Sequence, residues 1–241
     1  VATGAQPLVP AIKNIESVEY LTSDTIWEIR EQPKRLVVLG GGPIGTELSQ
    51  AFHRLGSEVT QIEAFDRIMS REDPEFSQMV MNSMKAEGVE ILTGHKATEV
   101  VIEGDEKFLR IESMASGESQ LVPFDQLLVA IGRKANVTGF GLEDLGVALT
   151  DRGTIEVDEY LRTNYPNIYA IGDVAGPYQF THTASHMAWY AAVNSLFGMF
   201  KKFKVDYSVV PWATFCSPEV ARVGLNETEA NAQNIPYEIA T

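Results

Sequence analysis

The stretch RLVVLGGGPIGTELSQAFHRLG, residues 35–56, places an apolar run directly before three consecutive glycines, a proline and a segment with helical spacing. The apolar run predicts a short strand. Pro43 suits the first helical position, where a backbone N–H would have no partner in any case. Gly56 predicts that the helix ends in a left-handed cap. The stretch therefore indicates a strand, a glycine turn and a helix.

The same alternation continues toward Gly94. EVTQIEA (58–64) predicts a second strand, and VEILTG (89–94) predicts a third. Between them, DPEFSQMVMNSMKAEG (73–88) predicts a helix with Asp73 as N-cap and Gly88 as the cap beyond its last turn. Strands that alternate with helices of this length predict a parallel sheet with right-handed crossovers.

The rhythm changes after Lys96, where short polar and apolar segments are joined by Gly, Asp and Ser. These segments predict an antiparallel meander. Further expected elements are a buried strand ending at Gly132, two short strands within 153–176 that end in Gly172 and Asp173, a helix over 182–198, and a new unit of strands and one helix from Phe203.

The composition indicates a folded protein that does not bind polyanions. With 241 residues, 44% hydrophobic and 22% charged, the chain can bury a normal core. Its formal net charge of −14 opposes phosphate neutralisation and argues against nucleic acid and anionic membranes as partners. No apolar run approaches the roughly 20 residues that cross a bilayer, so we expect no membrane segment and a cytoplasmic location.

Cysteine and histidine usage indicates neither an internal disulphide nor a metal site. Cys216 is the single cysteine, and its place on a predicted strand beside aromatic residues favours a small buried residue over a nucleophile. The four histidines lack metal-ligand spacing, and we expect surface or packing roles for them: His53, His95, His182 and His186.

The glycine turn has the spacing of a dinucleotide site. Gly40 would allow the tight turn, Gly42 would let a pyrophosphate reach the backbone, and Gly45 would let the helix pack on the strand. Glu63 ends the next strand 23 residues after Gly40, where a carboxylate accepts bonds from ribose hydroxyls and repels a 2′-phosphate. The pattern favours NAD(H) over NADP(H). A turn that serves only helix packing, with a solvated Glu63, is the alternative.

Five motifs follow one another in a fixed order. They are VATGAQP (1–7), GGGPIGTE (40–47), LLVAIGRKAN (127–136), TNYPNIYAIGDVAG (163–176) and VDYSVVPWATFCSPEVARVGLNETEA (205–230). The series resembles the class I pyridine nucleotide-disulphide oxidoreductases, the group of dihydrolipoamide dehydrogenase, mercuric reductase and glutathione reductase. The resemblance covers nearly the whole chain, and five motifs in order are more specific than any one of them.

The resemblance implies an α/β fold in which a Rossmann-like three-layer NAD-binding domain with an antiparallel β-meander is inserted in a split FAD-binding domain, followed by the start of an α+β dimerisation domain. The implied ranges are 1–32 for the end of the first FAD half and a linker, 33–132 for the NAD-binding domain, 133–202 for the second FAD half and 203–241 for the dimerisation domain. The chain would be the central part of a homodimeric flavoenzyme. The FAD glycine turn, the C-x-x-x-x-C redox pair and the partner's His-Glu pair would lie outside it.

Roles carry over by resemblance to individual positions. Glu47 would lie beside the nicotinamide, although it could also be an ordinary residue of the first helical turn, where the helix dipole favours it. The NAD-binding positions would be Gly40, Gly42, Pro43, Ile44, Gly45, Glu63, Ala97 and Gly132. The FAD-binding positions would be Thr3, Gly4, Asp173, Gln179, Phe180, Thr181 and His182.

The implied reaction passes a hydride from NADH to FAD and on to a small-molecule or protein disulphide or to a metal ion. The isolated chain is expected to bind NADH without turnover. An NADH-binding regulatory module and a flavoprotein reductase without a cysteine pair stay open as alternatives. THTASHMAW (181–189) lacks the Lys and Glu of the HKAxxE pattern of dihydrolipoamide dehydrogenases, which argues against lipoamide as the acceptor.

Overall fold

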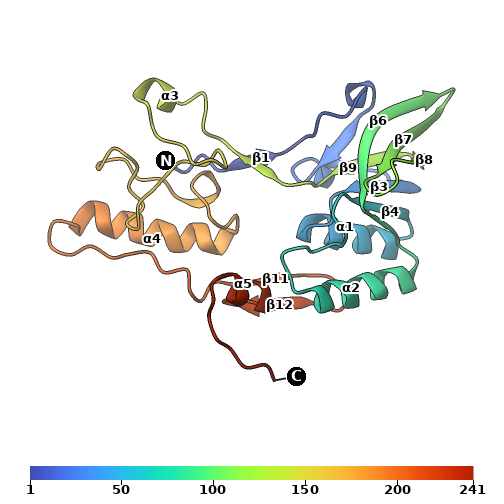
Figure 1. Ribbon diagram of the computed structural model, residues 1–241. Coiled ribbons are helices and arrows are strands. Elements are labelled where there is room, and N and C mark those ends of the chain that lie inside the picture. Colours follow the sequence, from blue (N-terminus) through green and yellow to red (C-terminus); the bar gives the residue numbers. More distant parts are fainter. Residues whose placement is uncertain (241) are drawn as a thin grey trace. The chain divides into compact units, whose positions relative to one another are not determined.

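The computed structural model describes residues 1–240, which form two compact units. Unit 1 contains residues 1–6 and 133–210, and unit 2 contains residues 7–132 and the described residues from 211 on. Each unit is therefore assembled from two separate stretches of chain, and residues 7–132 interrupt unit 1. Figure 1 follows the chain through both units.

Unit 2 is built on a parallel five-stranded sheet. In spatial order its strands are β2 (Tyr20–Thr22), β9 (Gln126–Val129), β3 (Arg35–Leu39), β4 (Glu58–Glu63) and β5 (Glu90–Thr93). The neighbouring strands pair in parallel, which confirms the parallel sheet predicted from the strand and helix alternation. The family resemblance implies that this domain begins at residue 33, whereas β2 already belongs to the sheet. Strand β2 has only three residues, which are too few to show a periodic pattern in the sequence. Only its pairing with β9 shows that it belongs to the sheet.

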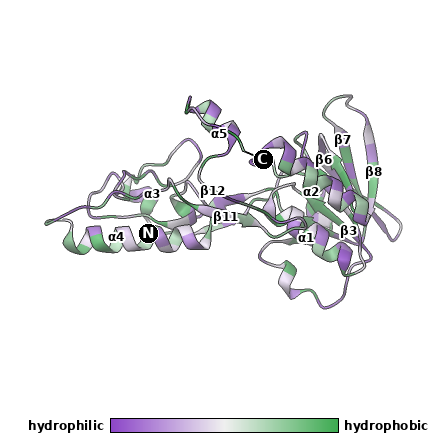
Figure 2. Ribbon diagram, turned by 90° about the horizontal axis from the view of Figure 1, so that it is seen from below, coloured by the Kyte–Doolittle hydropathy of each residue, from purple (hydrophilic) through white to green (hydrophobic). Residues whose placement is uncertain are grey.

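Two helices and a meander cover the two faces of this sheet. Helices α1 (Pro43–Arg54) and α2 (Pro74–Glu87) pack on one face, and the antiparallel strands β6 (His95–Glu103), β7 (Glu106–Ser113) and β8 (Ser119–Phe124) pack on the other. Figure 2 shows hydrophilic and hydrophobic residues alternating along α1 and α2, as helices with one buried face require. The predicted three layers and meander are confirmed. A short 3₁₀ turn, η1 (Ile15–Ser17), adds Ile15 to the core on the meander side.

Successive buried residues of β3 pack alternately against the helices on one face of the sheet and against the meander on the other. Leu36 and Val38 face the helices, whereas Val37 and Leu39 face the meander. All four side chains are at most 3% exposed. A strand buried on both faces is expected to be continuously apolar, which explains the run that opens the glycine turn.

The C-terminal stretch of unit 2 forms a hairpin and a helix. Strands β11 (Pro211–Thr214) and β12 (Val220–Val223) pair antiparallel, and α5 (Glu227–Ala232) follows. This element order matches the expectation of strands and one helix. The boundary differs from the expected Phe203, because residues 203–210 belong to unit 1. There Asn194 bonds both the N–H and the carbonyl of Phe203 and ties it to α4 (Thr181–Phe197).

Unit 1 has little regular structure besides α4. Its other elements are β1 (Ala5–Pro7), β10 (Arg133–Ala135), α3 (Leu142–Leu145) and η3 (Gly172–Val174), and β1 pairs with β10. Helix α4 ends at Phe197 with Gly198 as its C-cap, as expected. The core of the unit gathers Ile155, Leu161, Val174 and Met187, each without exposed surface.

The two short strands expected within 153–176 are not formed. This stretch makes only isolated bridges, Leu149 with Ile155 and Arg162 with Tyr169. Side chains bond the backbone instead: Asp158 Oδ1 accepts from the N–H groups of Tyr160 and Arg162 at 2.9 Å each. Asp, Asn and Thr side chains compete with strand pairing in this way, and the apolar pattern of the stretch does not reveal it.

Candidate functional site

The turn between β3 and α1 leaves no room for side chains at two of its glycines. Gly40 has φ +114°, and a Cβ added there would lie 2.3 Å from the backbone oxygen of Ala130. A Cβ on Gly45 would lie 2.1 Å from the backbone oxygen of Gly40. The first contact brings the turn against the end of β9, and the second brings α1 against its strand. Any other residue at either position would displace backbone.

Gly42 differs from both, because a Cβ built on it meets nothing within 4 Å. Gly42 is the N-cap of α1, no side chain caps this helix end, and Pro43 follows in the first turn. Ile44 lies in the same turn and is 36% exposed. The first turn of a helix concentrates free N–H groups and the positive end of the dipole. The space beside Gly42 and this uncapped helix end fit a pyrophosphate group.

Glu63 is held by backbone N–H groups of two turns, the β3–α1 turn and the turn that follows β4. Its Oε2 accepts the N–H of Gly41 at 2.5 Å, and its Oε1 accepts the N–H of Phe65 at 2.8 Å. Each carboxylate oxygen can accept a further bond, so these contacts leave capacity for ribose hydroxyls. The structure thus gives Glu63 a structural role beside the predicted ribose contact, which stays a prediction.

The carboxyl ends of three parallel strands bring the predicted NAD residues to one edge of the sheet. Gly40 follows β3, Glu63 ends β4, and Gly132 comes three residues after β9. Gly132 has φ +136° and no atom within 4 Å of an added Cβ. Ligands of parallel α/β sheets bind at this edge. Ala97 lies instead in the meander, half-buried on β6, next to an irregularity in the β6–β7 register.

Gln61 is a residue that the sequence analysis missed. It is fully buried, and its amide donates to the carbonyl of Gly40 at 3.0 Å and to the hydroxyl of Thr46 at 3.3 Å. This side chain therefore fixes the glycine turn from the neighbouring strand. The sequence shows only that two uncharged polar residues, Thr60 and Gln61, lie between the apolar Val59 and Ile62.

Glu47 lies half-buried on α1, and its Oε1 accepts the backbone N–H of Phe215 at 2.8 Å. Phe215 directly follows β11 and keeps its own side chain 73% exposed. The predicted nicotinamide-side carboxylate is therefore oriented by the C-terminal hairpin of the same unit. This contact argues against the alternative that Glu47 is an ordinary exposed residue of the first turn.

A cleft of about 500 Å³ in unit 1 brings several predicted FAD residues together. Four of those residues line it: Gly4, Asp173, Gln179 and Thr181. Asp173 lies 3.6 Å from Nε of Arg133, which lines the same cleft. Thr181 begins α4, which has no side-chain cap. A carboxylate for hydroxyl groups and an uncapped helix end fit part of a flavin dinucleotide.

The remaining predicted FAD residues do not line this cleft. Thr3 donates from its hydroxyl to the carbonyl of Asn136 at 2.7 Å, and Asn136 donates back to the carbonyl of Thr3. The rings of Phe180 and His182 stack on each other at 5.3 Å. Each of the three is a direct sequence neighbour of a residue that lines the cleft.

Cys216 is 8% exposed, and burial raises the pKa of its thiol. It packs in the core beside the helices of unit 2 as the sequence analysis expects. Within residues 1–240, no helix combines the length and apolar character that a bilayer crossing requires. Over the same range, no three His, Cys, Asp or Glu side chains gather as metal ligands would.

Comparison with known proteins gives the family. The pyridine nucleotide-disulphide oxidoreductase family matches residues 1–188, and the dimerisation domain of these enzymes matches residues 210–241. The chain belongs to the pyridine nucleotide-disulphide oxidoreductases, as the five motifs predict.

Relatives of two kinds of enzyme match the chain. The chain is 39% identical to mercuric reductase of Bacillus cereus over 100% of its length and 37% of the relative's. It is 43% identical to dihydrolipoyl dehydrogenase of Chlamydia pneumoniae over 99% of its length and 50% of the relative's. A solved structure, the Cu(II) complex of the HOCl-induced flavoprotein disulfide reductase RclA from Escherichia coli, matches with a TM-score of 0.84 and 31% identity, over 96% of this chain and 52% of that one. The chain spans half or less of the length of the curated relatives it matches.

Proposed function

We propose that this chain binds NADH at the β3–α1 turn and that the whole protein is an FAD-dependent oxidoreductase. The observation that carries the proposal is the open space at Gly42, beside an uncapped helix N-terminus and one strand away from Glu63. Gly42 and the first turn of α1 would hold the pyrophosphate. Glu63 would hold the adenosine ribose and disfavour a 2′-phosphate, which makes NADH the preferred nucleotide.

The cleft of unit 1 would hold part of FAD. Asp173 would accept bonds from hydroxyl groups of the flavin side chain, and the start of α4 would face polar or anionic groups. When bound, NADH supplies a hydride and FAD accepts it. The chain's own residues bind and orient: Glu47, fixed by Phe215, would place the nicotinamide amide, and the core beside it would exclude water.

The final electron acceptor is proposed at the level of class, a disulphide or a metal ion. Relatives named mercuric reductase and dihydrolipoyl dehydrogenase match the chain over nearly the same residues, which supports a shared nucleotide half with different acceptors. The match to a dimerisation domain supports a homodimer for the whole protein. A cytoplasmic location belongs to the same proposal.

An anaerobic titration of the full-length, flavin-loaded protein with NADH tests this function. NADH should bleach the visible flavin absorbance stoichiometrically, and NADPH should do so only at much higher concentration. Removal of the Glu63 charge should narrow the difference between the two nucleotides. Glu58→Gln removes a charge at the opposite end of β4, so it is the matched control and should leave both titrations unchanged. A protein that binds NADH without any bleaching would be a nucleotide-sensing module instead.

A further inference from the structure

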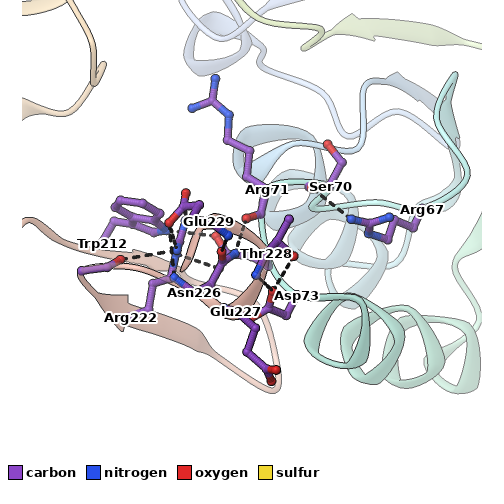
Figure 3. Close-up of polar contacts among 12 residues, drawn as sticks. Arg67, Ser70, Arg71, Asp73, Trp212, Arg222, Asn226, Glu227, Thr228 and Glu229 are labelled. Atoms are coloured by element: carbon purple, nitrogen blue, oxygen red, sulfur yellow. Dashed lines mark hydrogen bonds and ion pairs between the residues drawn. The ribbon is translucent and has the colours of Figure 1, made fainter. Parts of the chain in front are cut away.

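A cluster of charged side chains fastens the β11–β12 hairpin to the beginning of α2 (Figure 3). At its centre, Trp212 on β11 and Arg222 on β12 are direct cross-strand partners. The Arg222 guanidinium lies over the Trp212 ring at 3.9 Å from its centroid. Such a contact between partly buried groups favours the cation and orders the ring. The two strands of the hairpin are thereby locked to each other.

Glu72, just before α2, joins this pair to the rest of unit 2. Its Oε1 accepts from Trp212 Nε1 at 2.9 Å, and its Oε2 lies 3.2 Å from Arg222 Nε. On its other side Arg222 makes two bonds to Glu229, at 2.7 and 2.9 Å. The side chains of Arg222 and Glu72 are only 12% and 9% exposed. Loss of either partner would leave the other charge buried, which is costly.

The pKa directions agree with this geometry. Burial acts to lower the pKa of Arg222, but the hydrogen bonds that it donates to Glu229 and the charge of Glu72 outweigh this effect, and the pKa is raised. The bonds from Arg222 in turn lower the pKa of Glu229. Arg222 and Glu229 are therefore charged at neutral pH, and ionic hydrogen bonds hold the two side chains together.

Asp73 strengthens the same attachment. It occupies the N-cap position of α2 as predicted, yet its carboxylate does not cap that helix. It instead accepts from the N–H of Glu227 at 3.1 Å and from the N–H and hydroxyl of Thr228, at the start of α5. α5 already has a capping box formed by Asn226 and Glu229, and Asn226 also donates to the carbonyl of Arg71. The loop before α2 is thus hydrogen-bonded to both the β11–β12 hairpin and α5.

The far end of β11 meets the candidate site. Phe215, three residues after Trp212, donates its N–H to Glu47, and Ser217 exchanges two bonds with the Gln50 side chain. Glu72 and Arg222 therefore fix the beginning of β11, and the residues that follow β11 are bonded to side chains of α1. Whatever sets the position of β11 also sets where the Glu47 carboxylate is held.

We propose that Arg222 is a positioning residue for Glu47. Acting through Trp212 and β11, it holds the Phe215 N–H where it orients the carboxylate. The functional half of this inference rests on the proposed function, because it takes Glu47 to be the nicotinamide-side residue. The β3–α1 turn, which is proposed to bind the nucleotide, makes no bond to Arg222. Substitution of Arg222 should therefore change the position of Glu47 without changing the affinity for the nucleotide.

Hydrogen exchange on this chain tests the structural half. Arg222→Lys keeps the charge but loses the planar fork, and Trp212→Phe keeps a ring but loses the bond to Glu72. Each should speed exchange of the Phe215 amide about tenfold or more while β3 amides stay protected. Arg110→Lys, which weakens an Arg–Glu pair on the β6–β7 meander, is the matched control and should leave Phe215 unchanged. Unchanged Phe215 exchange in both hairpin variants, or equal acceleration in β3, would overturn the inference.

The functional half is read from a kinetic split in the full-length flavin-loaded protein. Both hairpin variants should lower the limiting rate of flavin reduction about tenfold and leave the Kd for NADH within about twofold. A rate that stays at the unmodified value, or a Kd that weakens in step with the rate, would contradict a positioning role. If the unmodified chain does not bind NADH at all, the proposed function fails, and the exchange experiment still decides whether Arg222 holds the Phe215 bond.

Discussion

The Gly40 turn of unit 2 and the Gly172 turn of unit 1 each follow an apolar segment, have a positive φ and precede a candidate site carboxylate. At Gly40 an added Cβ would lie 2.3 Å from backbone, whereas at Gly172 its nearest neighbour is the Ala184 methyl at 3.3 Å. Glu63 is fixed by two backbone N–H groups, that of Phe65 two residues on and that of Gly41 in the glycine turn. Asp173 instead lies 3.6 Å from Arg133, a residue far away in the sequence. In the first site both the glycine and the carboxylate are fixed by backbone groups, whereas in the second both have side chains as their neighbours.

Substitution of Gly40 should produce the largest effect. Gly40→Ala combines a positive φ with an overlap on the backbone of Ala130, so we expect a loss of roughly 3 kcal/mol or more in the free energy of unfolding. Gly117→Ala is the matched control, because Gly117 has φ +73° with nothing within 4 Å of an added Cβ. Urea unfolding of both variants measures the difference. Equal losses would show that the backbone at Ala130 yields and that the turn is less constrained than described.

Substitution of Gly172 should cost less. Gly172→Ala adds a positive-φ penalty and a tight contact with Ala184, for an expected loss of about 2 kcal/mol. Hydrogen exchange of unit 1 amides, such as that of Met187, measures this loss of stability in unit 1 separately from the stability of unit 2. A loss as large as that of Gly40→Ala would remove the contrast between the two turns.

Gly42 should separate stability from binding. Since nothing lies within 4 Å of a Cβ at this position, Gly42→Ala should change the free energy of unfolding by less than about 0.5 kcal/mol. The methyl group would occupy the space assigned to the pyrophosphate and weaken NADH binding about tenfold, or about 1.4 kcal/mol. Fluorescence titration of both proteins with NADH checks this. Unchanged affinity would place the phosphates elsewhere.

The smallest effect concerns acid sensitivity in unit 1. Burial acts to raise the pKa of Asp158, but its hydrogen bonds, above all with Arg162, outweigh it, and the pKa lies below the ordinary value. A lowered folded-state pKa gives stability that is present above the unfolded pKa of about 3.9 and is lost as the pH falls through the folded value. The side chain is 37% exposed, so Asp158→Asn should cost less than about 1 kcal/mol at neutral pH.

Exchange of the Arg162 amide at pH 7 and at pH 3 measures this contribution. The difference between Asp158→Asn and the unmodified chain should shrink at the lower pH. Asp151→Asn, an exposed turn residue of the same stretch, is the control. A difference that grows toward low pH would reverse the sign of the argument.

The two regions were also unequally predictable from the sequence. The glycine turn, its flanking strands and α1 follow from local rules about glycine, proline and apolar periodicity, and the place of Glu63 at the end of β4 follows from the same strand pattern. The strands expected within 153–176 were wrong because Asp158 bonds the backbone there. Three side chains act through partners that are distant in sequence or on another strand: Gln61, Trp212 and Arg222. One amino-acid sequence taken by itself contains no pattern that predicts such pairs. Asp73 was placed correctly at a helix start, but which helix it caps depends on tertiary packing.

The central claim is that the β3–α1 turn and Glu63 form an NADH site. Calorimetric titration of this chain with NADH and with NADPH tests it most directly. We predict that NADH binds about tenfold or more tightly than NADPH, and that Glu63→Gln, which removes the charge but keeps an acceptor for the Gly41 N–H, narrows the gap. Equal affinities of the unmodified chain for the two nucleotides, or no heat of binding with either, would contradict the account.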